Sequence, residues 1–238
     1  MKILALDSTA DIGSVAICDD GKLICEITVN TGNTHSESLL PAVEQALKLA
    51  GLCVDDIDLF ACSTGPGSFT GVRIGVATIK GLAYGKNKPC VSVSTLEALA
   101  QNLIGYNGII CPVMNARRNQ VYNALFRISD GVIERICRDR AIAIADLDCE
   151  LKNYTLPLYL CGDGYDITVK NSTLTNYGYV GDREKLQSAY SVARCAFRKF
   201  QGGDFVTDAT LVPIYLRPSQ AERERLERLK ANESTGDN

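Results

Sequence analysis

Short apolar runs interrupted by aspartate and glycine open the chain. Three of these runs predict strands, at residues 3–6, 14–18 and 22–29. An Asp-Asp-Gly sequence between the last two predicts a tight turn. From Ser36, which can cap a helix, the apolar positions recur every three or four residues as far as Ala50, and Gly51 then ends the pattern. This opening therefore predicts a three-stranded meander followed by an amphipathic helix.

The next segment alternates between strand and helix patterns. An all-apolar run at 57–62 predicts a strand that is buried on both faces. A helix is expected from Thr70 to Tyr84, followed by a strand at 89–94 and a helix at 95–103. Strands that are separated by helices in this way indicate an α/β sheet.

The pattern then starts again, which indicates an internal duplication. Residues 108–137 predict strand, polar turn, strand, Asp-Gly turn and strand, in the order found at the start of the chain. The matching positions lie roughly 110 residues apart and pair Asp7 with Asn115, 14–17 with 122–125, and Asp20-Gly21 with Asp130-Gly131. Further on, 156–164 predicts a strand and 184–201 a helix.

The duplication predicts two α/β lobes, at 1–103 and 104–218. The first lobe contains the two helices at 36–50 and 70–84. A polar tail at 219–238 has few large apolar residues and is expected to be partly disordered.

Composition and charge narrow the class of protein. The chain has 238 residues, of which 46% are hydrophobic and 22% charged, as is ordinary for a globular protein. A net charge of −3 provides no basic surface for direct nucleic-acid binding. The start of the chain has no long apolar segment of a signal peptide, and no apolar run reaches the ~18–20 residues of a membrane span. Ten cysteines without a CxxC pair predict buried free thiols. A cytoplasmic protein is expected.

The segment STGPGSFTGVRIG, Ser63–Gly75, is a glycine-rich loop that enters a helix. Free N–H groups at a helix start attract anions, so the loop is a candidate phosphate site. It lacks the Gly-Lys-Ser/Thr of a P-loop and the spacing of GxGxxG, and a tight strand-to-helix turn held by hydroxyl groups is the alternative. The candidate phosphate contacts are Asp7, Gly65, Gly67, Ser68 and Thr70.

The helix that follows this loop is unusually rich in small residues, namely Gly71, Gly75, Ala77, Gly81 and Ala83. Each glycine lowers helix propensity by ~1 kcal/mol relative to alanine. Close approach of another backbone could offset this cost. That backbone could belong to the helix at 36–50 or to another protein, and the sequence leaves both readings open.

Other catalytic or metal chemistry has little support in the sequence. The single histidine, His35, lies in an HSES sequence whose adjacent residues cannot converge into a triad, so a hydrogen-bonding role is expected. One histidine and scattered cysteines provide no zinc-like ligand spacing. Asp7 and Asp163, each near turn glycines, are the candidate carboxylates for acid–base work.

Taken together, ILALDST followed by SVAI, then HSESLLP, GPGSFTGVRIG, CGDG and PIYLR, resemble the TsaB (YeaZ) type of tRNA threonylcarbamoyladenosine biosynthesis protein. The resemblance spans Lys2 to Arg217. It implies two duplicated lobes of the actin, Hsp70 and sugar-kinase superfold. It also implies a non-catalytic subunit of the complex that transfers threonylcarbamoyl to the adenosine beside the tRNA anticodon.

The resemblance implies partners as well. These are a TsaD-like transferase subunit and a TsaE-like ATPase, with tRNA bound mainly through them and a homodimer formed when the chain is alone. The related TsaD subunit carries a metal-binding HxxxH, at whose places this chain has Thr95 and Leu99. Asn115 stands where the family often has aspartate. No catalytic residue, metal or tightly bound cofactor is therefore expected here, and ATP is used by the partners.

The family's pairing surface implies that the helices at 36–50 and 70–84 stack against their equivalents in the partner. The expected partner contacts are Leu39, Val43, Leu47, Gly71, Val72, Gly75, Val76 and Ile79. Two alternatives stay open. One is an active hydrolase or kinase-like ATPase of the same superfold, and the other is a homodimeric binding module.

Overall fold

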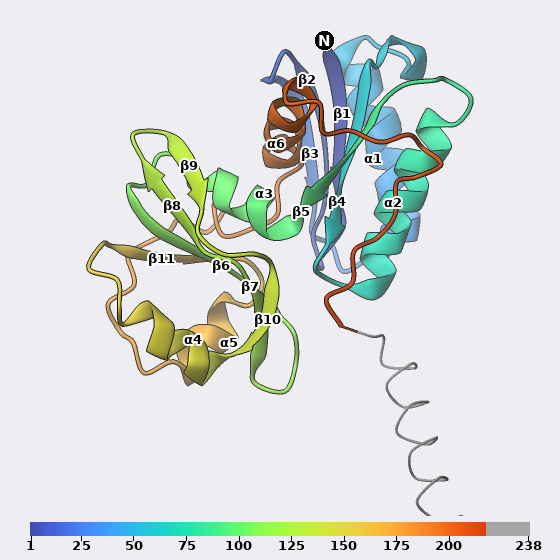
Figure 1. Cartoon of the computed structure of the whole chain (residues 1–238). Coiled ribbons are helices and arrows are strands. Elements are labelled where there is room, and N and C mark those ends of the chain that lie inside the picture. Colours follow the sequence, from blue (N-terminus) through green and yellow to red (C-terminus); the bar gives the residue numbers. More distant parts are fainter. Residues whose placement is uncertain (218–238) are drawn as a thin grey trace, which may run out of the picture.

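The computed structural model describes residues 1–217 and contains two β-sheets, each flanked by helices (Figure 1). The expected polar tail at 219–238 lies outside the described residues. Over the described part of the chain, every helix is too short or too polar to cross a bilayer. The prediction of a two-sheet α/β fold is confirmed.

The first sheet has the strand order β3-β2-β1-β4-β5. Its strands are β1 (Lys2–Asp7), β2 (Gly13–Asp19), β3 (Lys22–Val29), β4 (Leu59–Gly65) and β5 (Cys90–Ser94). β1 pairs antiparallel with β2 and parallel with β4. The expected meander and the expected α/β unit therefore share β1.

Three helices belong to the first hundred residues: α1 (His35–Ala50), α2 (Phe69–Ala83) and α3 (Thr95–Asn102). A short 3₁₀ turn lies at Val54–Asp56. α1 begins one residue before the expected Ser36, because Thr34 is the N-cap and its N–H donates to the Glu37 carboxylate. It ends as expected at Gly51, which has a left-handed φ of 67°.

Alternation along β1 builds two cores on the two faces of the first sheet. Leu4 and Leu6 pack with α1 and α2, whereas Ile3 and Ala5 pack with α6 (Ala189–Gln201) on the other face (Figure 1). α6 follows the second sheet in sequence but packs against the first. It begins at Ala189 rather than at the expected residue 184, because Ser188 caps it.

The second sheet repeats the centre of the first, a strand with antiparallel and parallel neighbours, as the internal duplication predicts, and adds β10 (Arg140–Ala143) at one edge. Its strands are β6 (Gly108–Asn115), β7 (Gln120–Asn123), β8 (Phe126–Ser129), β9 (Val132–Arg135), β10 (Arg140–Ala143) and β11 (Leu158–Cys161). β7 and β8 keep one antiparallel register against β6, and β11 pairs parallel with β6 as β4 does with β1. Two further helices, α4 (Ile144–Leu151) and α5 (Tyr165–Asn171), pack against this sheet.

The strand expected at 122–125 is interrupted after Asn123. The Asn123 side-chain amide donates to the carbonyl oxygens of Pro112 and Ala124, at 3.1 and 2.9 Å. The Leu125 N–H donates to the Cys137 sulfur instead of to a neighbouring strand. Side-chain hydrogen bonds therefore replace the ladder at this point.

Residues 204–217, called here the strap, return across the first lobe after α6 and run beside α2 (Figure 1). The strap pairs with β5 through two 2.8 Å hydrogen bonds between Val206 and Cys90. The Lys80 ammonium of α2 donates to the carbonyl oxygens of Ala209 and Leu211. The strap thus covers one side of α2 before it reaches the second lobe.

Candidate functional site

Asp7 ends β1 and has a fully buried carboxylate. The carboxylate accepts hydrogen bonds from the Ser63 hydroxyl at 2.5 Å and from the Thr9 N–H and hydroxyl at 3.0 and 2.8 Å. Burial raises the pKa of Asp7, and the hydrogen bonds from Ser63 and Thr9 oppose that rise. These bonds hold the turn after β1 against β4, so the carboxylate is engaged within the protein.

The turn after β1 explains most glycines of the loop and of α2. A Cβ at Gly67 would collide with the carbonyl oxygen of Thr9, and a Cβ at Gly71 with that of Ser8. A Cβ at Gly75 would lie 2.5 Å from the Ser8 hydroxyl oxygen, which itself donates to the Gly71 carbonyl at 2.8 Å. The approaching backbone therefore belongs to this chain and is a turn rather than a helix.

Gly81 differs from the other glycines of α2. It is exposed, and a Cβ added there meets nothing within 4 Å. Its lower helix propensity has no explanation in the packing of this chain.

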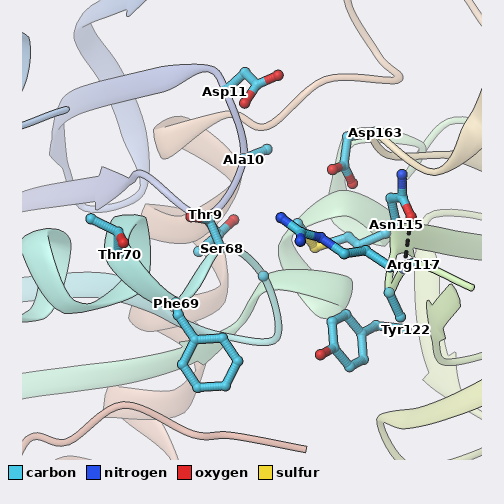
Figure 2. Close-up of a pocket in the computed structure, with 13 residues that line it drawn as sticks. Thr9, Ala10, Asp11, Ser68, Phe69, Thr70, Asn115, Arg117, Tyr122 and Asp163 are labelled. Carbon is cyan, nitrogen blue, oxygen red and sulfur yellow. Dashed lines mark hydrogen bonds between the residues drawn. The ribbon is translucent and has the colours of Figure 1, made fainter. Parts of the chain in front are cut away.

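A cleft of about 490 Å³ separates the glycine loop from the second lobe (Figure 2). Of the five candidate phosphate contacts, Gly67, Ser68 and Thr70 line it, and Asp7 and Gly65 are not among the residues that do. Ser68 caps α2 by accepting from the Gly71 N–H at 3.3 Å, so the first turn of α2 lies beside the cleft. Phosphate binding by these residues stays a prediction.

The second lobe contributes the opposite wall through the turn that follows β6. Arg117, Arg118 and Asn119 have φ values of 62°, 54° and 55°, three successive left-handed residues that are not glycine. The Asn115 side-chain oxygen accepts from the Arg117 N–H at 2.8 Å and stabilises the start of this turn. Such conformations cost energy and concentrate at functional sites.

Asp163 is the acidic group of the second lobe that lines the cleft, and its side chain is open to it (Figure 2). Desolvation by the cleft walls raises its pKa to about 6, and the negative charges of Asp11 and Asp7 act in the same direction. A backbone hydrogen bond from Asn115 opposes the rise. The two candidate carboxylates thus have different surroundings, since Asp7 is buried and Asp163 faces the cleft.

His35 lies outside the cleft lining and holds the loop that precedes β2. Its Nε2 lies 2.6 Å from the carbonyl oxygen of Ala10, and its ring fills the space beside Gly13. The histidine therefore positions the loop between β1 and β2.

Thr95 and Leu99, on α3, are both buried. Leu99 packs in the core of the second lobe with Met114 and lies close to Gly162, and the Thr95 hydroxyl has no hydrogen-bond partner in the described part of the chain. Within residues 1–217, no three histidine, cysteine or acidic side chains gather closely enough to hold a metal ion.

The side chains expected to contact a partner lie inside the chain's own core, which corrects their proposed role. All of Leu39, Val43, Leu47, Val72, Val76 and Ile79 are at most 7% exposed. They pack with Leu4 and Leu6 of β1, and Gly71 and Gly75 face the turn after β1. Apolar spacing predicted correctly which residues share one face of each helix, but in the structure that face points into the core.

The outward sides of α1 and α2 carry other residues. Arg73, Ala77, Gly81 and Tyr84 follow one another along the exposed side of α2 and its C-cap, and Tyr84 is 79% exposed. On α1, Leu40 and Leu49 are 49% and 65% exposed. We call the four α2 residues the outer face; Leu40 and Leu49, nine residues apart, lie on opposite flanks of α1 and are not part of it. Sequence spacing alone could not distinguish the outer face from the buried set.

Comparisons with known proteins match two related groups, both named for tRNA threonylcarbamoyladenosine biosynthesis or threonylcarbamoyl transfer. The family model described as TsaD, tRNA N6-adenosine threonylcarbamoyltransferase, matches residues 28–194. The tRNA threonylcarbamoyladenosine biosynthesis protein TsaB of Bacillus subtilis is 31% identical over 97% of this chain and 100% of its own length. The protein of that name from Escherichia coli is 37% identical over 56% of this chain and 58% of its own length.

A solved structure shows the same fold. YeaZ from Pseudomonas aeruginosa superposes with a TM-score of 0.77, covering 90% of this chain and 99% of that one, at 24% sequence identity.

Proposed function

The chain belongs to the TsaB family of tRNA threonylcarbamoyladenosine biosynthesis proteins, and from this premise we propose that it is a non-catalytic subunit that pairs with a TsaD-like transferase. The similarity over the whole length of the Bacillus subtilis protein is the observation that carries the proposal. In this role the chain supports transfer of threonylcarbamoyl to the adenosine beside the tRNA anticodon, and the transferase provides the reaction centre.

The core packing of α3 supports a role without catalysis. Leu99 is 1% exposed and surrounded by apolar side chains, so its place in the fold offers no ligand atom. Asp7 is fully buried, is held by Ser63 and Thr9 and does not line the cleft, so its carboxylate is not placed to serve a magnesium ion there.

The exposed sides of α2 and α1 support pairing through these two helices. Ala77 and Gly81 lie four residues apart on the exposed side of α2 and leave room for a partner helix to approach. Arg73 and Tyr84 flank them, and both residue types are enriched at the centres of protein interfaces. On α1, Leu40 is an exposed apolar side chain, at 49%.

The other components follow from the same role. A TsaE-like ATPase joins the pair and uses ATP, this chain holds no tight cofactor, and the tRNA is bound mainly by the partners because the chain has a net charge of −3. Without its partner the chain forms a homodimer through the same outer face.

Reconstitution tests this proposal. The chain, the TsaD-like subunit and the TsaE-like ATPase are purified and combined with ATP, threonylcarbamoyl adenylate as the group donor and unmodified tRNA, and modified adenosine is measured by mass spectrometry. We expect modification when all three are present, and a loss when this chain is omitted. Modification by this chain alone, or undiminished modification without it, would contradict the proposal.

The kinase-like alternative has a separate test. ATP hydrolysis by the isolated chain that is lost on Asp163→Asn would favour an ATPase with the cleft as its active site. We expect no hydrolysis above the buffer rate from either protein.

A further inference from the structure

The end of the strap connects both lobes at the edge of the cleft. Leu211 is 1% exposed and belongs to the core beneath α1 and α2. Leu216 packs against the core of the second lobe, which includes Tyr122, and Arg217 donates from Nη1 to the Ala116 carbonyl at 3.2 Å. Residues 211–217, called here the latch, thus have one end in each lobe.

The latch also makes direct backbone contact with the glycine loop. The Ile214 N–H donates to the Thr64 carbonyl at 2.8 Å, at the end of β4. Gly65 allows this crossing, because a Cβ there would collide with the Ile214 carbonyl oxygen. The position of the latch and that of the loop lining the cleft are therefore tied together.

Tyr215 links the latch to the start of α2. Its ring stacks on Phe69, with centroids 4.6 Å apart and planes inclined by 10°, and Phe69 lines the cleft. Arg73 donates from Nε to the Tyr215 hydroxyl at 2.7 Å and lies 5.5 Å from the centre of that ring. Arg73 is exposed on the outer face, so a surface residue of α2 holds an element that reaches the second lobe.

We propose that the latch limits how far the two lobes separate and thereby sets the width of the cleft, with Arg73 as the residue that keeps Tyr215 in place. At this edge of the cleft, the lobes can separate only if Leu216 and Arg217 leave the second lobe. An acidic partner side chain that captured Arg73 would remove the hydrogen bond to Tyr215 and loosen the latch. This last consequence rests on the proposed function, whereas the latch itself does not.

The native cysteines allow a direct distance measurement in the isolated full chain. Cys53 in the first lobe and Cys149 in the second are exposed, and Cys25 and Cys137 are partly exposed. Nitroxide labels are attached to Cys53 and Cys149 in a parent protein with Cys25→Ser and Cys137→Ser, and the distance distribution is read by double electron–electron resonance. For the parent we expect a single narrow distribution.

The latch variant combines Leu216→Ala with Arg217→Ala, and the control is Val212→Ala, a residue of the same segment that is 58% exposed. We expect the latch variant to shift the distribution to longer distances and broaden it, and the control to match the parent. A latch variant indistinguishable from the parent, or a control that shifts equally, would overturn the proposal.

A second variant keeps the test independent of core packing. Arg73→Ala changes an exposed side chain and leaves Leu211 and Leu216 intact. We expect the same direction of change with a smaller amplitude. An unchanged distance distribution in Arg73→Ala would show that Arg73 does not hold the latch. The distance measurement uses the isolated chain, so its result does not depend on whether pairing is found in the reconstitution.

Discussion

Gly71 and Gly81 lie ten residues apart on α2, and the same substitution to alanine should have opposite effects at the two positions. A Cβ at Gly81 meets nothing, so Gly81→Ala gains the helix propensity of alanine, about 1 kcal/mol. A Cβ at Gly71 collides with the Ser8 carbonyl, and relieving that collision moves the turn that holds Asp7. Overpacking of this kind costs about 1–3 kcal/mol, and more where backbone must move.

Because the obstacle at Gly71 is backbone, the upper end of this cost, about 3 kcal/mol, applies, and the helix-propensity gain of about 1 kcal/mol leaves a net loss of about 2 kcal/mol for Gly71→Ala. At 2–4 °C per kcal/mol for a protein of this size, the two variants should differ in Tm by roughly 6–12 °C. Thermal unfolding of both variants and the parent, followed by circular dichroism, gives the comparison. Equal Tm values would refute the assignment of Gly71 to the inside and of Gly81 to the outer face.

Three further predictions concern buried and titrating groups. The pKa of Asp163 is raised to about 6 in the folded protein, so its contribution to stability is present below its ordinary pKa and is lost as pH rises through about 6. Asp163→Asn should therefore have a higher Tm than the parent at neutral pH and lose that advantage in acid. A difference in Tm that stays constant across this pH range would contradict the prediction. Ser63→Ala removes the 2.5 Å hydrogen bond to the buried Asp7 carboxylate and should lower the free energy of unfolding by about 1–3 kcal/mol in urea titrations, whereas Ser36→Ala, an exposed control, should change it little. A thiol reagent should modify the exposed Cys53 and Cys149 rapidly and the buried thiols only after unfolding, because burial excludes the reagent and raises the thiol pKa, for Cys18 to about 12. Rapid reaction of all ten thiols in the folded protein would contradict this prediction.

Hydrophobic periodicity predicted the elements of the first lobe well. The strand at Lys22–Val29 has the expected ends, and α1 and α2 each begin within one residue of the expected position. These segments have long, regular patterns and strong end signals such as Gly51, so local physics determines them. The duplication was also visible, because turn residues such as Asp130-Gly131 recur at the same place in both halves.

The direction in which each helix faces could not be predicted from the same pattern. Leu39 and Leu40 are adjacent leucines, yet one is 2% exposed and the other 49%, and only the position of β1 decides between them. The need for glycine at 71 depends on Ser8, which lies far away in the sequence. α6 was expected to continue the second lobe, and its packing against Ile3 and Ala5 depends on the crossover between the sheets.

Some residues of the candidate site could be predicted from the sequence, and others could not. The glycine loop was recognisable from its composition, and Gly67, Ser68 and Thr70 do line the cleft. The wall formed by Asn115, Arg117 and Tyr122 was not predicted as part of a site, because the sequence does not reveal that three successive residues in the turn after β6 are left-handed. The latch was missed because its residues have no periodic pattern and act through single contacts.

Pairing with the TsaD-like subunit through the outer face is the central claim, and an affinity comparison of two tyrosine variants tests it most directly. Tyr84 on the outer face and Tyr179 on the second lobe are 79% and 80% exposed, so Tyr84→Asp and Tyr179→Asp are closely matched. In calorimetric titrations against the TsaD-like subunit, we expect Tyr84→Asp to weaken binding at least about tenfold, which is about 1.4 kcal/mol, and Tyr179→Asp to bind like the parent. Equal binding by both variants, or a larger loss in Tyr179→Asp, would contradict the account.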